Sequence, residues 1–136
     1  MDKIKLVAIL RGIQPAEAAD HIETLINAGF RYIEIPLNSP DWQQSIPAMV
    51  RQFGERAMIG AGTVLKVEQV DFLAEAGAKL IVTPNTAPAV IRRAVDKGML
   101  VCAGCATASE AFSALDAGAQ WLKIFPSSAF GPDYIR

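Results

Sequence analysis

The sequence predicts an α/β fold made of repeated βα units, and it favours a barrel of parallel strands over an open, doubly wound sheet. A strand, a turn marked by Gly or Pro and a helix recur at nearly uniform spacing. No G-x-G-x-x-G follows the first expected strand, as a dinucleotide-binding sheet would require. Polar residues collect at the carboxyl ends of nearly every strand, where barrel enzymes place their chemistry. Only six strands are legible, so a barrel fragment and an open sheet both stay open.

The expected strands share short apolar runs that end in polar or turn-forming residues. They comprise residues 6–11, 31–37, 57–64, 79–85, 100–107 and 121–127. Residues 7–10 and 80–82 are apolar on both faces, which is typical of parallel strands covered by helices.

Helices are expected between the strands, each with local start signals or an apolar stripe. Pro15 marks the first position of the first helix, and Ser45, followed by Pro47, is expected to cap the second. Thr107 and Glu110 form a capping box for the fifth helix. The stripes of the first, third and fourth helices comprise Ala18, Ile22, Leu25 and Ile26, then Val67, Val70 and Leu73, then Val90, Ile91, Ala94 and Val95. Residues 131–133 indicate the start of a sixth helix.

Composition narrows the class of protein. With 136 residues, of which 51% are hydrophobic and 20% charged, the chain fits one compact domain with a real core. A net charge of −1, without a stripe of Lys and Arg, argues against a nucleic acid partner. No apolar run approaches the roughly 18 residues that span a bilayer, and residues 1–5 lack the apolar segment of a signal peptide. We therefore expect no membrane partner and a cytoplasmic location.

Cys102 and Cys105 form a C-x-x-C spacing, which is typical of a redox pair or of half a zinc site. They fall within an expected strand, where residues i and i+3 face opposite sides. The sequence holds no second cysteine pair, and its single histidine, His21, is expected on a helix surface. We interpret both cysteines as small buried residues and expect no metal and no cofactor.

Lys123 is the residue that points most directly to function. It stands in the middle of an apolar strand, with Trp121 and Phe125 on the same face. An amine in apolar, water-poor surroundings loses its proton more readily, and the free amine attacks carbonyls, as a Schiff-base lysine must. The alternative is a lysine near the strand end whose ammonium group reaches solvent.

Glu34 is expected to be buried on the inner face of its strand, because Ile33 and Ile35 occupy the other face. A carboxylate and an amine inside one parallel sheet suggest an acid–base group and a nucleophile, although a structural ion pair is the alternative. Arg11, at the end of the first strand, would bind a substrate carboxylate or phosphate unless it is simply solvated. Thr63, at the end of the third strand, would hydrogen-bond a carboxylate or hydroxyl.

Five stretches together resemble the class I KDPG/KDPGal aldolase family, and the resemblance runs in order along all 136 residues. They are residues 9–12, 33–40, 60–64, 82–85 and 122–127. The resemblance implies a (β/α)8 TIM barrel, of which residues 1–136 would be the N-terminal part, about six βα units, with strands seven and eight absent. Asn38 stands where gluconate-directed relatives usually carry arginine, so the chain resembles the galactonate branch.

The resemblance implies a class I aldolase, a carbon–carbon lyase that cleaves 2-dehydro-3-deoxy-6-phosphogalactonate to pyruvate and glyceraldehyde 3-phosphate. By position, Lys123 matches the Schiff-base lysine and Glu34 the general acid/base. The positions that match substrate-binding residues are Arg11 and Thr63 at the carboxylate end, Pro84 and Phe125 as apolar walls, and Asn85. The family uses no metal and generally forms trimers, so a homo-oligomer is expected.

Three alternatives stay open beside this interpretation. The first is a gluconate-specific or dual-specificity aldolase on the same scaffold. The second is a non-catalytic half-barrel, because the loops that hold the phosphate in such barrels follow strands seven and eight, and the first and sixth strands would be unpaired edges. The third is a phosphate-binding isomerase on a related barrel, which would not need Lys123 as a nucleophile.

Overall fold

The strands form one parallel sheet in the order β1-β2-β3-β4-β5-β6, in a computed structural model that describes residues 5–136. Each strand from β2 to β6 pairs in parallel with the strand that precedes it in the sequence. A doubly wound sheet would instead reverse its strand order at a switch point. The six-unit sheet is therefore part of a (β/α) barrel, as predicted.

All six predicted strands are present and each is shorter than expected, because pairing stops where the chain turns into the following loop. Their bounds are β1 Val7–Ile9, β2 Tyr32–Pro36, β3 Met58–Gly62, β4 Leu80–Val82, β5 Leu100–Cys105 and β6 Trp121–Ile124. The helices are α1 Pro15–Asn27, α2 Trp42–Phe53, α3 Val67–Glu75, α4 Pro88–Asp96, α5 Ala108–Asp116, α6 Ser127–Phe130 and α7 Pro132–Ile135.

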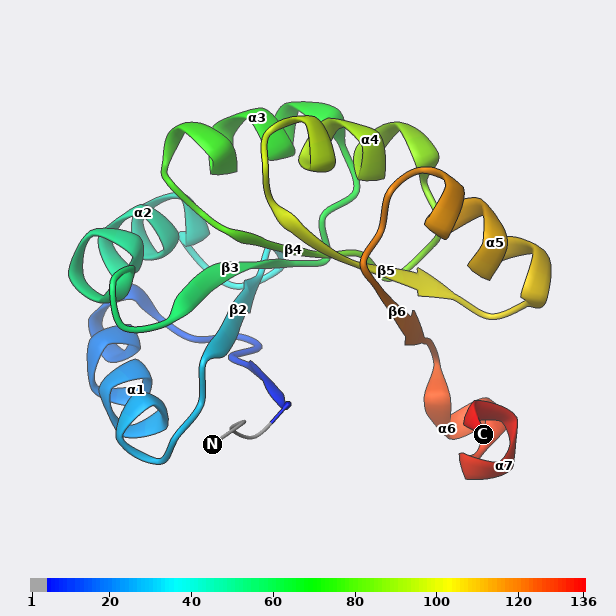
Figure 1. Cartoon of the computed structure of the whole chain (residues 1–136). Helices are drawn as coiled ribbons and strands as arrows, with labels where there is room; N and C mark the ends of the chain where they lie inside the picture. The colour runs from blue at the N-terminus through cyan, green and yellow to red at the C-terminus, as the bar shows by residue number, and fades with distance from the viewer. Residues whose placement is uncertain (1–4) are drawn as a thin grey trace.

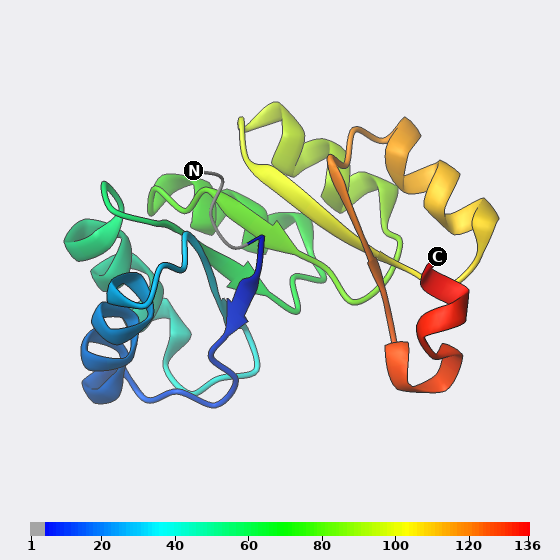
Figure 2. The same ribbon diagram turned by 60° about the horizontal axis from the view of Figure 1, so that its bottom comes forward.

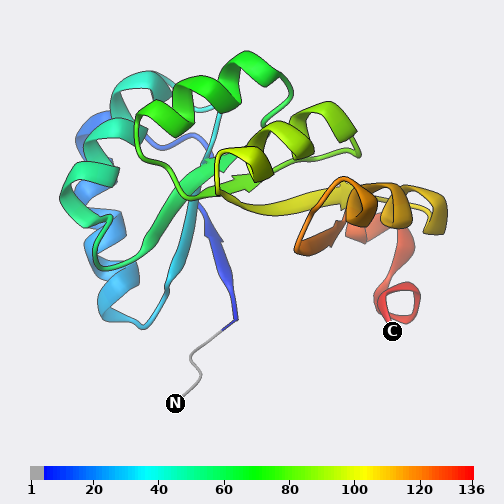
Figure 3. The same ribbon diagram turned by 45° about the horizontal axis from the view of Figure 1, so that its top comes forward.

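Helices α1 to α5 follow the outer side of the curved sheet, and the inner side is left uncovered (Figure 1). Figures 2 and 3 show the same layering from two further directions, with β1 and β6 as the outermost strands. Ile9 on β1 is 50% exposed and Leu122 on β6 is 37% exposed. The described chain is thus a half-barrel with two unpaired, apolar edges. Our interpretation of residues 1–4 as not belonging to a signal peptide lies outside the described residues.

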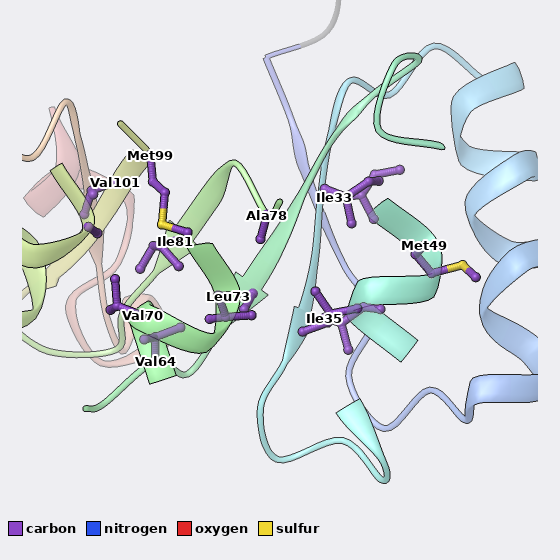
Figure 4. Packing of buried hydrophobic residues seen from close by; sticks show 14 of the residues in the cluster. Ile33, Ile35, Met49, Val64, Val70, Leu73, Ala78, Ile81, Met99 and Val101 are labelled. Carbon is purple, nitrogen blue, oxygen red and sulfur yellow. The ribbon is translucent and has the colours of Figure 1, made fainter. Parts of the chain in front are cut away.

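The core lies between the outer face of the sheet and the helices. Ile33 and Ile35 of β2 are fully buried on the side where α2 and its Met49 lie (Figure 4). Val70 and Leu73 of α3 belong to the same buried cluster. Because side chains alternate along a strand, burying these residues outward turns the residues between them toward the inner face. That alternation places the candidate catalytic groups inside the barrel.

Most of the predicted helix signals are confirmed. Pro15 begins α1, and its buried residues are Ala18, Ile22 and Ile26. The Thr107 hydroxyl caps α5 by accepting a hydrogen bond from the Glu110 amide at 3.2 Å. The α7 helix begins at Pro132, as residues 131–133 indicated.

The predicted cap of the second helix is wrong. Helix α2 begins at Trp42, with Asp41 as its N-cap, so Ser45 and Pro47 both lie inside it. The Asp41 carbonyl accepts the amides of Gln44 and Ser45 at 2.9 and 3.1 Å, which starts the helix one turn earlier. A proline this close to the start removes one backbone hydrogen bond but leaves the first turn intact.

Three aromatic residues are only partly buried. Trp42 and Trp121 are only half-buried, and Phe125 is 40% exposed. Trp121 and Phe125 face the open interior of the half-barrel, while Trp42 lies on the helical layer against Phe72. Amphipathic aromatics suit such partly covered positions.

Two further findings concern metals and membranes. Both cysteines are free thiols, with Cys105 buried and Cys102 half-buried. Among residues 5–136, no three His, Cys, Asp or Glu side chains gather as a metal site would require. No helix within this part of the chain has the length and apolar character to span a membrane.

Candidate active site

Glu34 lies on the inner face of β2 and is 2% exposed, while Ile33 and Ile35 are fully buried on the outer face. Its neighbours in the sheet are Ile9 on β1 and Gly60 on β3. The predicted burial of this carboxyl group is confirmed, and the alternation of the strand is its cause.

The Glu34 carboxyl group occupies the space where a side chain at position 62 would lie if this residue were not glycine. A Cβ atom at Gly62 would overlap the carboxyl oxygens of Glu34. One of those oxygens, Oε2, is buried and has no hydrogen-bond partner in the described chain. Burial raises the pKa of Glu34 from 4.5 to about 7, although the positive charges of Lys123 and then Arg11 oppose the rise. The group therefore exchanges its proton near neutral pH, as an acid–base catalyst must.

Lys123 extends from the inner face of β6 and is half-buried. It pairs with Gly104 on β5, so no side chain stands beside it on the neighbouring strand. Its Nζ lies 4.6 Å from the centre of the Phe125 ring, a cation–π contact. Phe125 thus lies next to the amine.

One cavity of about 270 Å³ brings Glu34 and Lys123 together. The rest of its lining is apolar apart from the Cys102 thiol, and consists of Val7, Ile9, Val82, Cys102 and Leu122. Neither charged residue joins the close ion pairs of residues 5–136, which link Arg56 to Glu23, Arg93 to Asp71 and Arg136 to Asp133. The two groups therefore face a shared space instead of neutralising each other directly, which argues against the structural ion pair.

Arg11 lies in the turn after β1 and is exposed. It lines a second cavity of about 280 Å³ together with Ile9 and Glu17. The turn is held by Ser39, whose buried hydroxyl accepts the Gly12 amide at 3.0 Å. Arg11 is thus placed at the rim, near enough for its charge to act on Glu34 but outside the lining of the shared cavity.

Thr63 follows β3 directly and has a φ of 54°. A positive φ is unusual for a β-branched residue, and such strain is concentrated at functional sites. The side chain is half-buried and does not belong to the lining of the shared cavity. Thr63 follows the carboxyl end of β3 as Arg11 follows that of β1, so both lie at the same end of the parallel sheet.

Pro84 and Asn85 form the loop after β4, and this loop folds against β5. A Cβ atom at Gly104 would overlap the Pro84 carbonyl group and the Asn85 amide. Thr83, fully buried, accepts the Gly104 amide at 3.1 Å and donates to the Asn85 carbonyl at 2.7 Å. Pro84 is thereby held beside the strand position that pairs with Lys123, whereas Asn85 is exposed.

Sequence reasoning missed several residues that shape this site. Ser39 and Thr83 fix the two loops, Gly62 and Gly104 leave space for the carboxyl group and for the loop, and Cys102 lines the cavity. Burial raises the pKa of the Cys102 thiol, which suits a packing role. The two glycines at positions 60 and 62 can be seen in the sequence, but only the structure shows that Gly62 leaves space for the Glu34 carboxyl group.

The sequence of this chain is similar to a family of aldolases and to curated members of it. Residues 1–135 match the family described as KDPG and KHG aldolase. The 2-dehydro-3-deoxy-6-phosphogalactonate aldolase of Escherichia coli (strain K12) is 67% identical over 134 residues, which is 98% of this chain and 65% of that protein. A probable 2-dehydro-3-deoxy-6-phosphogalactonate aldolase of Rhizobium meliloti (strain 1021) is 51% identical, over 96% of this chain and 61% of that protein.

Solved structures agree with this result. The native KDPGal structure superposes with a TM-score of 0.96 at 67% identity, covering 99% of this chain and 66% of that one. The chain thus spans less than two thirds of the length of the two curated relatives. Since the family match extends over nearly every residue, this chain belongs to the KDPG and KHG aldolase family.

Proposed function

We propose that this chain carries the Schiff-base site of a class I aldolase that cleaves 2-dehydro-3-deoxy-6-phosphogalactonate, as the N-terminal part of one aldolase barrel. The observation that carries the proposal is the shared, largely apolar cavity lined by Lys123 and Glu34. A nucleophilic amine beside a carboxyl group that titrates near neutral pH is the pair that imine chemistry needs.

In this mechanism the Lys123 amine adds to the C2 carbonyl of the keto acid and forms a carbinolamine. Glu34 donates a proton to the departing hydroxyl group, so water leaves and an iminium forms. Glu34, now a carboxylate, accepts the proton of the C4 hydroxyl group; the C3–C4 bond breaks, and the electron pair of that bond moves into the iminium to give an enamine. Glyceraldehyde 3-phosphate leaves as the aldehyde. The remaining enamine takes a proton at C3, and hydrolysis of the imine releases pyruvate and the free lysine.

The other predicted residues have supporting roles in this proposal. Arg11 and Thr63, at the rim, would bind the carboxylate of the keto acid, since a guanidinium fork matches a carboxylate. Pro84 and Phe125 would enclose the pyruvyl group from the β5 and β6 sides. Asn85, exposed on the same loop as Pro84, is the weakest of these candidates.

The direct test is to incubate the chain with pyruvate and borohydride and to measure the intact mass and the modified peptide. We expect one adduct, located on Lys123, and none in Lys123→Ala. Lys79→Ala is the matched control, because Lys79 is an exposed lysine next to β4. An adduct that persists in Lys123→Ala would overturn the assignment of Lys123, and no adduct from a soluble, folded chain would favour the non-catalytic half-barrel.

The choice between epimers is tested with the two phosphorylated keto-deoxy acids as competing substrates. Two relatives named as galactonate-type aldolases, at 67% and 51% identity, support the galactonate epimer. We expect the galactonate compound to be cleaved with the higher kcat/KM. Equal values would instead support a dual-specificity aldolase.

We also propose a trimer, as the family resemblance implies. Phe112 and Leu115 on α5 are 68% and 46% exposed, and exposed apolar side chains of this size suit an interface. Light scattering coupled to gel filtration measures the mass directly, and a monomer at all concentrations would contradict a trimer.

A further inference from the structure

We propose that Tyr32 and Trp121 form a strut across the barrel interior that sets the separation between Glu34 and Lys123. The two aromatic residues would act as positioning residues, since they lie beneath the reacting groups and do not bind substrate. The inference rests on the proposed aldolase function, which it extends by naming what holds the two reacting groups in place.

The aromatic contact joins two strands that are not neighbours. Tyr32 lies on β2 and Trp121 on β6, and β3, β4 and β5 separate these strands in the sheet. Their ring centroids are 4.9 Å apart with the planes at 78°, an edge-to-face arrangement. Such a geometry is favoured by the aromatic quadrupole. The contact therefore crosses the open inner side of the sheet instead of following its hydrogen bonds.

Each aromatic residue stands two positions before a reacting group. Tyr32 precedes Glu34 on β2, and Trp121 precedes Lys123 on β6. Side chains two positions apart on a strand point to the same face and lie about 7 Å apart along it. The aromatic pair thus forms the interior layer directly below the layer that contains the carboxyl group and the amine.

The strand register shows that both layers have the same offset. From Glu34, paired residues run through Gly60, Leu80 and Leu100 to the position of Ala119 on β6. Lys123 lies four positions beyond Ala119, and four strand steps separate β2 from β6. A (β/α)8 barrel advances by about one residue per strand, so this offset brings Lys123 level with Glu34. Trp121 is brought level with Tyr32 in the same way.

Within residues 5–136, the sheet connects β2 to β6 only through β3, β4 and β5. Without a direct contact, the distance from Glu34 to Lys123 would depend on the accumulated twist of four strand pairs, each of which varies by several degrees. The contact between Tyr32 and Trp121 lies only two residues from each reacting group, so it limits how far Glu34 and Lys123 can move apart. A misplacement of a reacting group by about 1 Å is enough to lower the reaction rate roughly 100-fold.

The test compares Trp121→Ala with a matched control, Trp42→Ala. Trp42 makes a second edge-to-face pair, with Phe72 at 5.3 Å and 83°, on the outer helical layer away from the cavity. Both substitutions remove one tryptophan from one aromatic pair. The measured quantities are the rate of borohydride-trapped pyruvate adduct at low and saturating pyruvate, the thermal transition, and the dependence of the trapping rate on pH.

We expect Trp121→Ala to slow trapping by roughly 10- to 100-fold at saturating pyruvate, and Trp42→Ala to leave the rate within about 2-fold of wild type. Trp121→Phe, which keeps an aromatic ring, should recover most of the rate. Opening the layer below also admits water to Glu34, so the acidic limb of the pH profile should move toward lower pH in Trp121→Ala. A purely structural role would lower the thermal transition without moving this limb.

Two outcomes would overturn the strut. One is a folded Trp121→Ala that traps pyruvate at the wild-type rate with the wild-type pH profile. The other is a doubly substituted Tyr32→Ala, Trp121→Ala chain whose loss equals the product of the single losses, because a real contact makes them non-additive. If Trp121→Ala does not fold, Trp121→Leu replaces it with the same criteria.

Failure of the proposed function is distinguishable from failure of the strut. If the wild type forms no adduct, the aldolase assignment fails. The role of the Tyr32–Trp121 contact is then tested by unfolding experiments at several pH values. The strut then requires that Trp121→Ala weaken the pH dependence of stability that Glu34 confers, while Trp42→Ala leaves it unchanged. Equal pH dependence in both variants would reject it.

Discussion

Replacing Glu34 with glutamine should change how the stability of the chain depends on pH. The carboxyl group has a pKa of 4.5 when solvated and about 7 in the folded chain, chiefly because it is buried. Between these values the folded state keeps a proton that the unfolded state has released. The stability that this group contributes is therefore fully present below pH 4.5 and is lost as the pH rises through 7.

The size of the effect follows from the same two pKa values. A difference from 4.5 to about 7 corresponds to about 3 kcal/mol in the free energy of unfolding, since one pKa unit is 1.36 kcal/mol. Glutamine has nearly the same shape but no titrating proton. Relative to Glu34→Gln, the wild type should thus lose about 3 kcal/mol of stability between pH 4.5 and pH 8.

The assay is urea unfolding of both chains at half-unit steps from pH 4 to pH 8.5, with the difference taken at each pH so that shared titrations cancel. Glu23→Gln serves as the control of opposite sign. The Glu23 side chain is 44% exposed, and its hydrogen bond with Arg56 lowers its pKa, so its contribution is lost at low pH instead. A flat difference for Glu34→Gln across pH 4.5–8, or a wild type that gains stability there, would refute the reasoning from burial.

Three further predictions concern the site and the scaffold. Gly62→Ala should slow the trapping of pyruvate by about 10-fold or more, because the new methyl group displaces the Glu34 carboxyl group, and adduct formation over time measures this. Phe53→Ala should lower the free energy of unfolding by about 3–5 kcal/mol in urea titrations, since Phe53 is 1% exposed in the core. Thr107→Ala should cost about 1 kcal/mol in the same assay, because the Glu110 amide loses its cap.

Much of the fold could be predicted from the sequence because its signals are local. Each βα unit has its own apolar run, its own turn and its own helix start, as Pro15 and the Thr107 cap illustrate. The second helix could not be placed correctly. The helix starts after Asp41, which has a left-handed backbone conformation with a φ of 50°. Aspartate adopts this conformation only occasionally, so nothing in the sequence favoured Asp41 over Ser45 as the N-cap.

The candidate site could be predicted only in part. An acidic residue between two isoleucines and a lysine between two aromatics are visible as breaks in an apolar pattern, and both residues reach the same cavity. The roles of Ser39 and Thr83 were not visible, because each binds a backbone amide of a distant loop or strand. Hydroxyl side chains have no periodic signal that would indicate such long-range partners.

The interior of this half-barrel can accommodate two ionisable groups because neighbouring positions lack side chains. Glu34 pairs with Gly60 and covers Gly62, and Lys123 pairs with Gly104. Glycine normally weakens a strand, so its presence on the inner face next to each ionisable group indicates a need for space. At Gly62 that space holds the carboxyl group itself, and at Gly104 it holds the loop that includes Pro84. These glycine positions do not follow a hydrophobic pattern in the sequence. Their role can be recognised only when the strand register is known. The chemistry of the site is thus set by the positions where side chains are missing as much as by the two residues that carry charge.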